Sequence, residues 1–343
     1  MVFPVVLPSP RTPDSRDAPP LRWGVLGTGW IAQRFVASLL EFTRQEVAAV
    51  GSRSLESASA FAAAAGVPEA RAYGSYDELV ADDDLDVVYV ATPHHLHLPH
   101  TLLALEAGRN VFVEKPIGLD GDEVARMEAV ALEHGLFLRE ALWSQYLPKF
   151  DVIRQLLDDG ALGEVHSVQA DLGEYFPPDH RIMRADLAGG PRYDLLTYAL
   201  WFAHWVFGPS DAVVETHEVV TRAPVNVSPS GVEGQISVSQ RTASGGVASL
   251  FATVLGETPT TATVVGSEAT LSIDGPFYQP GGFTLRSRDG RELRHDEPRI
   301  AHRGLHFEAA AVARDLSGLQ TVMTPTHNGR VGIDREPHEG VTS

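Results

Sequence analysis

The chain has 343 residues, a formal net charge of −18 and no cysteine. Its length exceeds that of one typical domain, so we expect two domains around separate cores. The negative charge argues against nucleic acid and anionic membrane surfaces as partners, and the lack of cysteine excludes disulfides and cysteine-ligated metals and fits a cytoplasmic location.

Residues 1–20 contain six prolines and no apolar core long enough for a signal peptide, which predicts a disordered extension. No later run is long enough to span a membrane. Residues 21–140 alternate between strand-like and helix-like patterns, as in a doubly wound α/β domain with a parallel sheet. The expected strands are 22–27, 46–51, 86–91, 110–114 and 136–140. The expected helices are 30–41, 54–65, 75–81, 97–108 and 120–134.

A glycine-rich turn joins the first expected strand to the first helix. The run Gly27-Thr28-Gly29-Trp30-Ile31-Ala32 has the GxGxxA spacing of a dinucleotide-binding turn. The first glycine permits the tight turn, the second lets a pyrophosphate approach the backbone, and the small alanine allows close packing of helix on strand. Because amide groups at the start of the helix would hold the phosphates, these first five residues are predicted cofactor contacts. The alternative is a plain strand-to-helix turn.

The second expected strand ends in Gly51-Ser52-Arg53 and lacks the acidic residue that binds a ribose 2′-hydroxyl. An arginine there suits a 2′-phosphate. The sequence therefore favours NADP over NAD, with Ser52 and Arg53 as contacts. The alternative is that Arg53 is a surface residue before the next helix.

The next two strands deliver polar residues to the edge of the sheet where ligands bind. After 86–91 come Thr92, His94 and His97, which we expect near the ribose and nicotinamide; their spacing differs from that of a helical zinc site, so no metal is predicted. At the end of 110–114 stand Glu114 and Lys115, also expected beside the cofactor. A lysine there is poised for chemistry, although a solvated strand end would look the same.

The regular alternation of strands and helices stops in the second half of the chain, and residues 141–325 are predicted to form an α+β domain. A helix is expected through Leu157, a strand near 165–172 and a helix near 193–207. Several alternating β-branched segments between 213 and 296 predict a largely antiparallel sheet, followed by a helix near 306–316. Residues 326–343 are expected to form an irregular tail.

The segment from Gly189 to Tyr198 is a second candidate for chemistry. Asp194 and Tyr198 are four residues apart, so they would share one face of a helix. Tyr198 is a candidate proton donor, since the Lys115 cation would favour an ionised phenol nearby. A core tyrosine is the alternative.

Together these residues resemble the glucose-fructose oxidoreductase and inositol dehydrogenase superfamily, within it the branch of dimeric dihydrodiol dehydrogenases and NADP-dependent xylose dehydrogenases. The resemblance covers about residues 21–208 and is weaker around Phe307-Glu308-Ala309. The matching segments are Gly27-Thr28-Gly29, Ala72-Tyr73-Gly74-Ser75-Tyr76-Asp77-Glu78-Leu79, Glu114-Lys115-Pro116, Glu140-Ala141-Leu142-Trp143, Leu162-Gly163-Glu164 and Gly189 to Tyr198.

The resemblance implies a Rossmann domain and an α/β domain whose open sheet often forms a dimer interface, so a homodimer or homotetramer is expected. It implies that Lys115 orients the substrate and tunes the acid, that Tyr198 exchanges the proton and that Asp194 assists. It implies that Trp143 lines the substrate pocket and that the Lys115-Pro116 bond is often cis.

Two departures from the family pattern stand in the Gly189-to-Tyr198 segment. The chain has Pro191-Arg192 where the family usually has Ala-Leu, and Leu196 where the family keeps a glycine. A leucine there could crowd the cleft or the packing beneath it. Gln145 also replaces an arginine that is usual in the branch.

The sequence thus predicts an NADP-dependent oxidoreductase that moves a hydride between nicotinamide and a secondary alcohol carbon of a sugar, polyol or cyclic diol. The alternative, favoured by Arg192 and Leu196, is a non-catalytic NADP-binding sensor or partner-binding protein with a decayed site. A third possibility known in the superfamily is redox-assisted elimination or glycoside cleavage with tightly held NAD, against which Arg53 argues.

Overall fold

A computed structural model describes residues 3–298 and 300–319. It divides into two compact units. The parallel-sheet unit comprises Arg22–Gly29 and Val47–Ala141, and the mixed-sheet unit comprises the described parts of Met1–Leu21, Trp30–Glu46 and Leu142–Thr326. One division falls at Ala141/Leu142, close to the expected domain boundary, but the first helix groups with the mixed-sheet unit. The expected tail at 326–343 lies outside the described residues.

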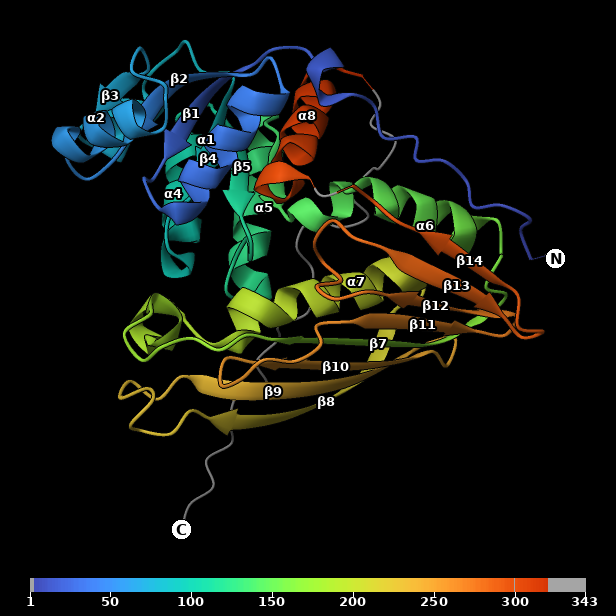
Figure 1. The fold of residues 1–343 in the computed structure, drawn as a ribbon. Coiled ribbons are helices and arrows are strands. Elements are labelled where there is room, and N and C mark those ends of the chain that lie inside the picture. The colour runs from blue at the N-terminus through green and yellow to red at the C-terminus, as the bar shows by residue number, and fades with distance from the viewer. Residues whose placement is uncertain (1–2, 299, 320–343) are drawn as a thin grey trace. The chain divides into compact units, whose positions relative to one another are not determined.

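The first sheet is six-stranded with the order β3-β2-β1-β4-β5-β6, and every pair that it forms is parallel (Figure 1). The chain therefore moves outward in one direction after β1 and in the other after β4, which creates a switch point between these two strands. The strands are β1 (Arg22–Leu26), β2 (Glu46–Gly51), β3 (Arg71–Tyr73), β4 (Val87–Val90), β5 (Asn110–Glu114) and β6 (Leu138–Ala141). The expected Rossmann arrangement is confirmed.

Apolar side chains of the helices cover one face of this sheet. Val88, Val90 and Val111 pack in one buried cluster with Ala104 of α4 and Met127 of α5. The central strands are buried on both faces, which explains their nearly continuous apolar sequence. The helices of the unit are α2 (Leu55–Ala64), α3 (Tyr76–Val80), α4 (His97–Glu106) and α5 (Gly121–His134). The structure adds β3, which the sequence reading missed.

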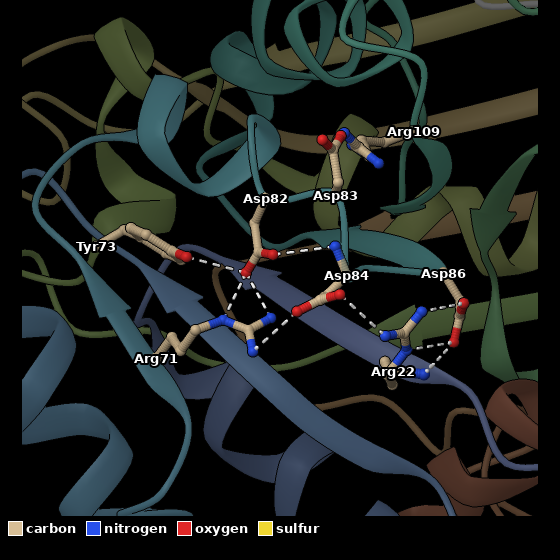
Figure 2. A network of polar contacts seen from close by, with 8 residues as sticks. All are labelled: Arg22, Arg71, Tyr73, Asp82, Asp83, Asp84, Asp86 and Arg109. Atoms are coloured by element: carbon tan, nitrogen blue, oxygen red, sulfur yellow. Dashed lines mark hydrogen bonds and ion pairs between the residues drawn. The ribbon is translucent and has the colours of Figure 1, made fainter.

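An acidic loop at residues 81–86 precedes β4 and lies at the amino edge of the sheet. Arginines at the starts of β1, β3 and β5 bind it, as Figure 2 shows: Arg22 pairs with Asp84 and Asp86, Arg71 with Asp82 and Asp84, and Arg109 with Asp83. Asp82 is the most buried member, with a side chain that is 7% exposed. Burial would raise the pKa of Asp82, but hydrogen bonds from Arg71, the Asp84 amide and Tyr73 outweigh it and hold this pKa below its usual value.

The mixed-sheet unit contains an eight-stranded sheet with the order β14-β13-β12-β11-β7-β10-β9-β8. Within the described part of this sheet, only the β7–β10 pair is parallel, so the expected, largely antiparallel α+β arrangement is confirmed. The strands are β7 (Val165–Gly173), β8 (Val213–Arg222), β9 (Glu233–Thr242), β10 (Val247–Thr253), β11 (Ala262–Gly266), β12 (Ala269–Ile273), β13 (Phe283–Ser287) and β14 (Glu292–His295).

Helices of the mixed-sheet unit include α1 (Trp30–Phe42), α6 (Pro148–Asp158), α7 (Thr197–Phe207) and α8 (Leu305–Leu316). Helix α7 packs on β7 and β10 (Figure 1). Nine of its residues are buried, including Trp201, Phe202 and Trp205, so α7 supplies much of this core. Before it, Arg192–Leu196 forms a π-helical turn, where the sequence suggested ordinary α-helix.

The amino-terminal segment follows a defined course from residue 3, whereas its composition predicted disorder. Arg11 forms an ion pair with the buried carboxylate of Asp151 on α6 at 2.7 Å. Ala18 packs with Ala310 and Ala313 of α8. The prediction rested on proline content and local hydrophobicity, which do not register contacts with residues more than a hundred positions away.

We expect Asp82→Ala to lower the free energy of unfolding by about 2 kcal/mol, because it removes charged hydrogen bonds and leaves Arg71 and Tyr73 without this acceptor. Asp83→Ala is the matched control; its side chain is 95% exposed, so the loss should stay below about 1 kcal/mol. Urea titration followed by circular dichroism measures both. Equal losses for the two variants would contradict this account of the loop.

Candidate active site

The glycine-rich turn between β1 and α1 has the geometry that a dinucleotide needs. Gly27 has φ of +107°, and a Cβ on it would come within 2.8 Å of the Ala91 carbonyl oxygen. Only glycine is tolerated there. At Gly29 the nearest atom to a Cβ is the same oxygen at 3.9 Å, and the residue is exposed, so a ligand can approach this backbone. The residues present therefore fit a bound pyrophosphate.

Trp30 begins α1 and presents its ring to solvent, with 55% of the residue exposed. The guanidinium carbons of Arg34 and Arg303 lie 5.2 and 5.6 Å from its ring centroid. Cations at these distances attract the face of an indole. Ile31, the next predicted contact, is partly buried.

The carboxyl end of β2 carries the residues predicted to select the cofactor. Ser52 is buried, its amide donates to Tyr73 O at 3.2 Å, and its hydroxyl lies 3.4 Å from that of Thr28. Arg53 is exposed and close enough to lower the pKa of Tyr76, which burial raises. This end of the sheet therefore combines an exposed cation with the glycine-rich turn.

The two histidines predicted after β4 are both buried. His97 is fully buried, and its two ring nitrogens lie 2.7 Å from Pro116 O and 2.8 Å from Thr92 O. Burial lowers the pKa of His97 to about 4, helped by the Lys115 cation. A neutral imidazole carries a single N–H, so His97 can donate to only one of these two carbonyl oxygens, and the cofactor contact expected of this residue stays a prediction. His94 is also buried and packs edge-on against the His97 ring.

Glu114, Lys115 and Pro116 follow at the end of β5, and the Lys115-Pro116 bond is cis. Glu114 is buried; its carboxylate accepts a hydrogen bond from the Tyr89 hydroxyl and another from the Lys115 amide at 3.1 Å. Lys115 is partly buried. Glu140 on β6 accepts from the Ile117 amide at 3.0 Å.

Glu140 is a residue whose role the sequence reading missed. Burial raises the pKa of Glu140 to about 7, although the Ile117 amide and the Lys115 cation both favour its ionised form. Its position on β6 opposite Val113 brings it to the same edge of the sheet as Lys115. The carboxyl ends of β5 and β6 therefore hold a lysine together with two buried acids.

In the mixed-sheet unit, Tyr198 lies within an aromatic cluster. The Trp143 indole donates its N–H to the Tyr198 hydroxyl at 2.9 Å. The Tyr278 ring lies 4.4 Å from that of Tyr198 and 5.8 Å from that of Trp143, measured between centroids. Burial raises the pKa of Tyr278, which keeps its phenol protonated. The sequence associated Trp143 and Tyr198 separately with the substrate and gave no signal for Tyr278, which is 80 residues further along.

Asp194 lies in the π-helical turn and is 6% exposed. Arg181 reaches it from the preceding loop, with Nη2 2.7 Å from Oδ1 and Nη1 3.4 Å from Oδ2. Such a two-pronged pair fixes the orientation of a carboxylate. Arg181 was not predicted, because a lone arginine in a loop carries no local signal.

The two unusual residues of this segment have structural partners. Arg192 binds Glu218 of β8 at 2.9 Å and Glu233 of β9 at 3.1 Å. Its guanidinium thereby anchors the π-helical turn to the sheet. Leu196 is fully buried.

Within residues 3–298 and 300–319, no three histidine, aspartate or glutamate side chains are grouped so that they could hold a metal ion. None of the helices in that part of the chain is both long and apolar enough to cross a membrane.

Known proteins resemble this chain over most of its length. Residues 21–141 match the oxidoreductase family with an NAD-binding Rossmann fold, and residues 150–272 match the GFO/IDH/MocA C-terminal domain. The trans-1,2-dihydrobenzene-1,2-diol dehydrogenase of Xenopus laevis is 31% identical over 304 residues, covering 86% of this chain and 89% of the relative. That of Danio rerio is 32% identical over 317 residues, covering 90% and 92%.

Two solved structures share the fold. A 3-ketoreductase from Actinomadura kijaniata, in complex with NADP and TDP-benzene, has a TM-score of 0.76 and 26% identity, covering 88% of this chain and 90% of that one. An aldose-aldose oxidoreductase from Caulobacter crescentus, complexed with glycerol, has a TM-score of 0.77 and 25% identity, covering 90% and 92%.

Fold, turn and relatives together define an NAD(P)-dependent oxidoreductase that acts on CH–OH groups. The chain belongs to the Gfo/Idh/MocA family.

We expect His97→Gln to reduce the acid sensitivity of the fold. A histidine with a pKa of about 4 when folded and about 6.5 when unfolded loses stability as the pH falls between these values. The difference in unfolding free energy between the native chain and His97→Gln should therefore narrow by about 2 kcal/mol from pH 7.5 to pH 5.

Denaturant titrations at the two pH values measure this difference. His134→Gln, at an exposed helix end, controls for the loss of a histidine and should leave the acid sensitivity in place. A gap between the native chain and His97→Gln that stays constant would contradict a buried, neutral His97.

Proposed function

We propose that the protein uses NADP to move a hydride to or from a secondary alcohol carbon of a sugar, polyol or cyclic diol. The observation that carries the proposal is the placement of Lys115 at the carboxyl edge of the parallel sheet, beside a turn that fits a dinucleotide. The dihydrodiol dehydrogenase and sugar-oxidoreductase relatives support the substrate class. When bound, the nicotinamide supplies or accepts the hydride.

Tyr198 is proposed to exchange the hydroxyl proton of the substrate. The N–H bond from Trp143 holds the phenol oxygen in one position and stabilises negative charge on it during proton transfer. The rings of Trp143 and Tyr278 surround Tyr198 with apolar surface suited to one face of a diol or sugar ring.

Lys115 is proposed to stabilise negative charge on the substrate oxygen, and Asp194 to orient the substrate hydroxyl. A lysine cation favours the ionised forms of nearby oxygens, which lowers the barrier to removing the proton. The pair with Arg181 holds the Asp194 side chain in one orientation, in which its oxygens can accept a hydrogen bond from a hydroxyl.

NADP in preference to NAD is proposed from the charge at the end of β2. Arg53 is exposed there, and the carboxyl end of the strand supplies no acidic residue to bind a 2′-hydroxyl. The 3-ketoreductase solved with NADP supports this choice. Thr28, Gly29 and Trp30 would contact the phosphates, and Thr92 and His94 would lie towards the nicotinamide. A cytoplasmic homo-oligomer remains part of the proposal.

A second candidate function is a non-catalytic sensor with a decayed site. It was favoured by Arg192, where the family usually has a leucine, and by Leu196, where the family keeps a glycine. The partners of Arg192 are Glu218 and Glu233 on the sheet, so two carboxylates of the same unit neutralise its charge. This placement favours the enzyme.

Lys115→Met should lower kcat at least 100-fold with a panel of aldoses, polyols and cyclic diols, while NADP affinity changes less than about threefold, because the lysine acts in the transition state. Tyr198→Phe should behave similarly. If both groups serve one proton-transfer step, the double variant should be about as slow as the slower single variant.

NADPH absorbance gives the rates, and quenching of protein fluorescence gives the affinity. A double variant whose fold loss in kcat equals the product of the two single losses would contradict a shared step. Tight NADP binding by the native chain without turnover across the panel would favour the sensor.

Arg53→Ala should raise KM for NADP about 10- to 100-fold and leave KM for NAD unchanged, because only NADP carries the 2′-phosphate. Arg44→Ala removes an exposed arginine before the opposite end of β2 and is the matched control. Parallel kinetics with both cofactors test the assignment. An equal loss with NADP and NAD would overturn it.

A further inference from the structure

Glu140 is a buried acid for which the proposed reaction has no task. It stands on β6 in register with Val113 of β5, two residues before Lys115. Only 9% of the residue is exposed. Burying a carboxyl group raises the free energy of the fold unless a partner hydrogen-bonds to it or balances its charge. The groups around Glu140 therefore indicate its role.

The first partner of Glu140 is the backbone just after Lys115. Its Oε1 accepts the Ile117 amide proton at 3.0 Å. From the other side, His97 Nδ1 lies 2.7 Å from the carbonyl oxygen of Pro116. The Pro116–Ile117 segment is therefore fixed by one side chain from β6 and another from α4, and Lys115 is directly attached to it.

The second partner is the charge of Lys115. The register of β6 with β5 brings Glu140 to the strand end that carries Glu114 and Lys115. The Lys115 cation favours the ionised form of Glu140, whereas the Glu114 carboxylate opposes it. Glu114 is itself engaged by the Tyr89 hydroxyl and the Lys115 amide. His97, from α4, is buried close enough to Lys115 for the cation to disfavour its protonation.

We propose that Glu140 is a positioning residue for Lys115: its carboxyl oxygen fixes the Pro116–Ile117 segment, and its ionised form is the counter-charge that holds the Lys115 ammonium in place for the reaction. The inference rests on the proposed role of Lys115. It also predicts that the reaction rate depends on pH through Glu140, because burial raises the pKa of Glu140 to about 7. Below that pH the counter-charge is lost while the hydrogen bond to Ile117 is kept.

Glu140→Gln separates the two tasks, because a glutamine oxygen can still accept from Ile117 but carries no charge. The native chain and Glu140→Gln should turn over at similar rates at pH 6, where Glu140 is largely neutral. At pH 8.5 Glu140→Gln should be about 10-fold slower in kcat, with NADP affinity within about twofold, as expected for loss of one charged contact. Glu140→Ala removes both tasks and should be slower at both pH values.

Glu133→Gln makes the same chemical change at an exposed position on α5 and should match the native chain throughout. The kinetics use the panel compound that the native chain oxidises fastest. A rate ratio between native and Glu140→Gln that does not change from pH 6 to pH 8.5 would overturn the counter-charge role, since a purely structural residue has no reason to act only when ionised.

A readout independent of turnover is the titration of Glu140 itself, followed by the carboxyl carbon shift of chain labelled with ¹³C-glutamate and assigned by its absence in Glu140→Gln. The midpoint should lie near 7 in the native chain and higher in Lys115→Met, because the lysine lowers the pKa of Glu140. An unchanged midpoint in Lys115→Met would show that the two groups do not interact.

The measurements on Lys115→Met and Glu140→Gln also distinguish a failure of this inference from a failure of the proposed function. Full activity of Lys115→Met would remove the catalytic role of the lysine, and with it the purpose of Glu140. A slow Lys115→Met with a Glu140→Gln that resembles the native chain at every pH would leave the proposed function standing and reject the inference.

Discussion

The parallel hydrogen-bonding register of β1, β2, β4, β5 and β6 is the constraint on which the candidate site depends. Parallel pairing makes all five strands end at the same edge. Segments separated by tens of residues then meet there: the glycine-rich turn, Arg53, the histidines after β4, Lys115 and Glu140. The switch point between β1 and β4 leaves room at this edge for a ligand.

The two edges of the parallel sheet differ in how their charged side chains are paired and buried. At the amino edge, the four aspartates of residues 81–86 are matched by three arginines that begin or precede β1, β3 and β5. These pairs are mostly exposed and contribute to stability alone. At the carboxyl edge, the carboxyl groups of Glu114 and Glu140 are buried, and burial raises the pKa of Glu140 to about 7. Strongly shifted values of this kind are typical of functional sites.

The sequence predicted those parts of the fold that local patterns determine. Strands β1, β2, β4, β5 and β6 and their helices were placed within a few residues, because buried parallel strands are apolar runs and the helices between them have clear periodicity. Strand β3 was missed because Arg71–Tyr73 is three residues long and has no buried alternation. The order at the amino terminus was missed because it depends on Asp151 and α8.

The site was predictable where a motif carries its own geometry, as with Gly27 and Lys115. It was not predictable where the fold buries a polar residue and brings its polar atoms against groups distant in the sequence. His97 has the sequence position of a ligand contact, yet its ring nitrogens lie against the carbonyl oxygens of distant Pro116 and nearby Thr92. Arg181 and Tyr278 reach Asp194 and Tyr198 from separate loops, and no spacing rule connects them. The structure also explains Arg192, which the sequence left as an anomaly.

The most direct test of the central claim is the fate of the hydrogen on the alcohol carbon. Aldose, polyol and cyclic diol substrates deuterated at their secondary carbinol carbons would be incubated with the protein and NADP, and the reduced cofactor analysed by mass spectrometry. The account predicts that at least one substrate yields reduced NADP carrying one deuterium. Reduced NADP without deuterium, or NADP that binds and stays oxidised with every substrate, would contradict it.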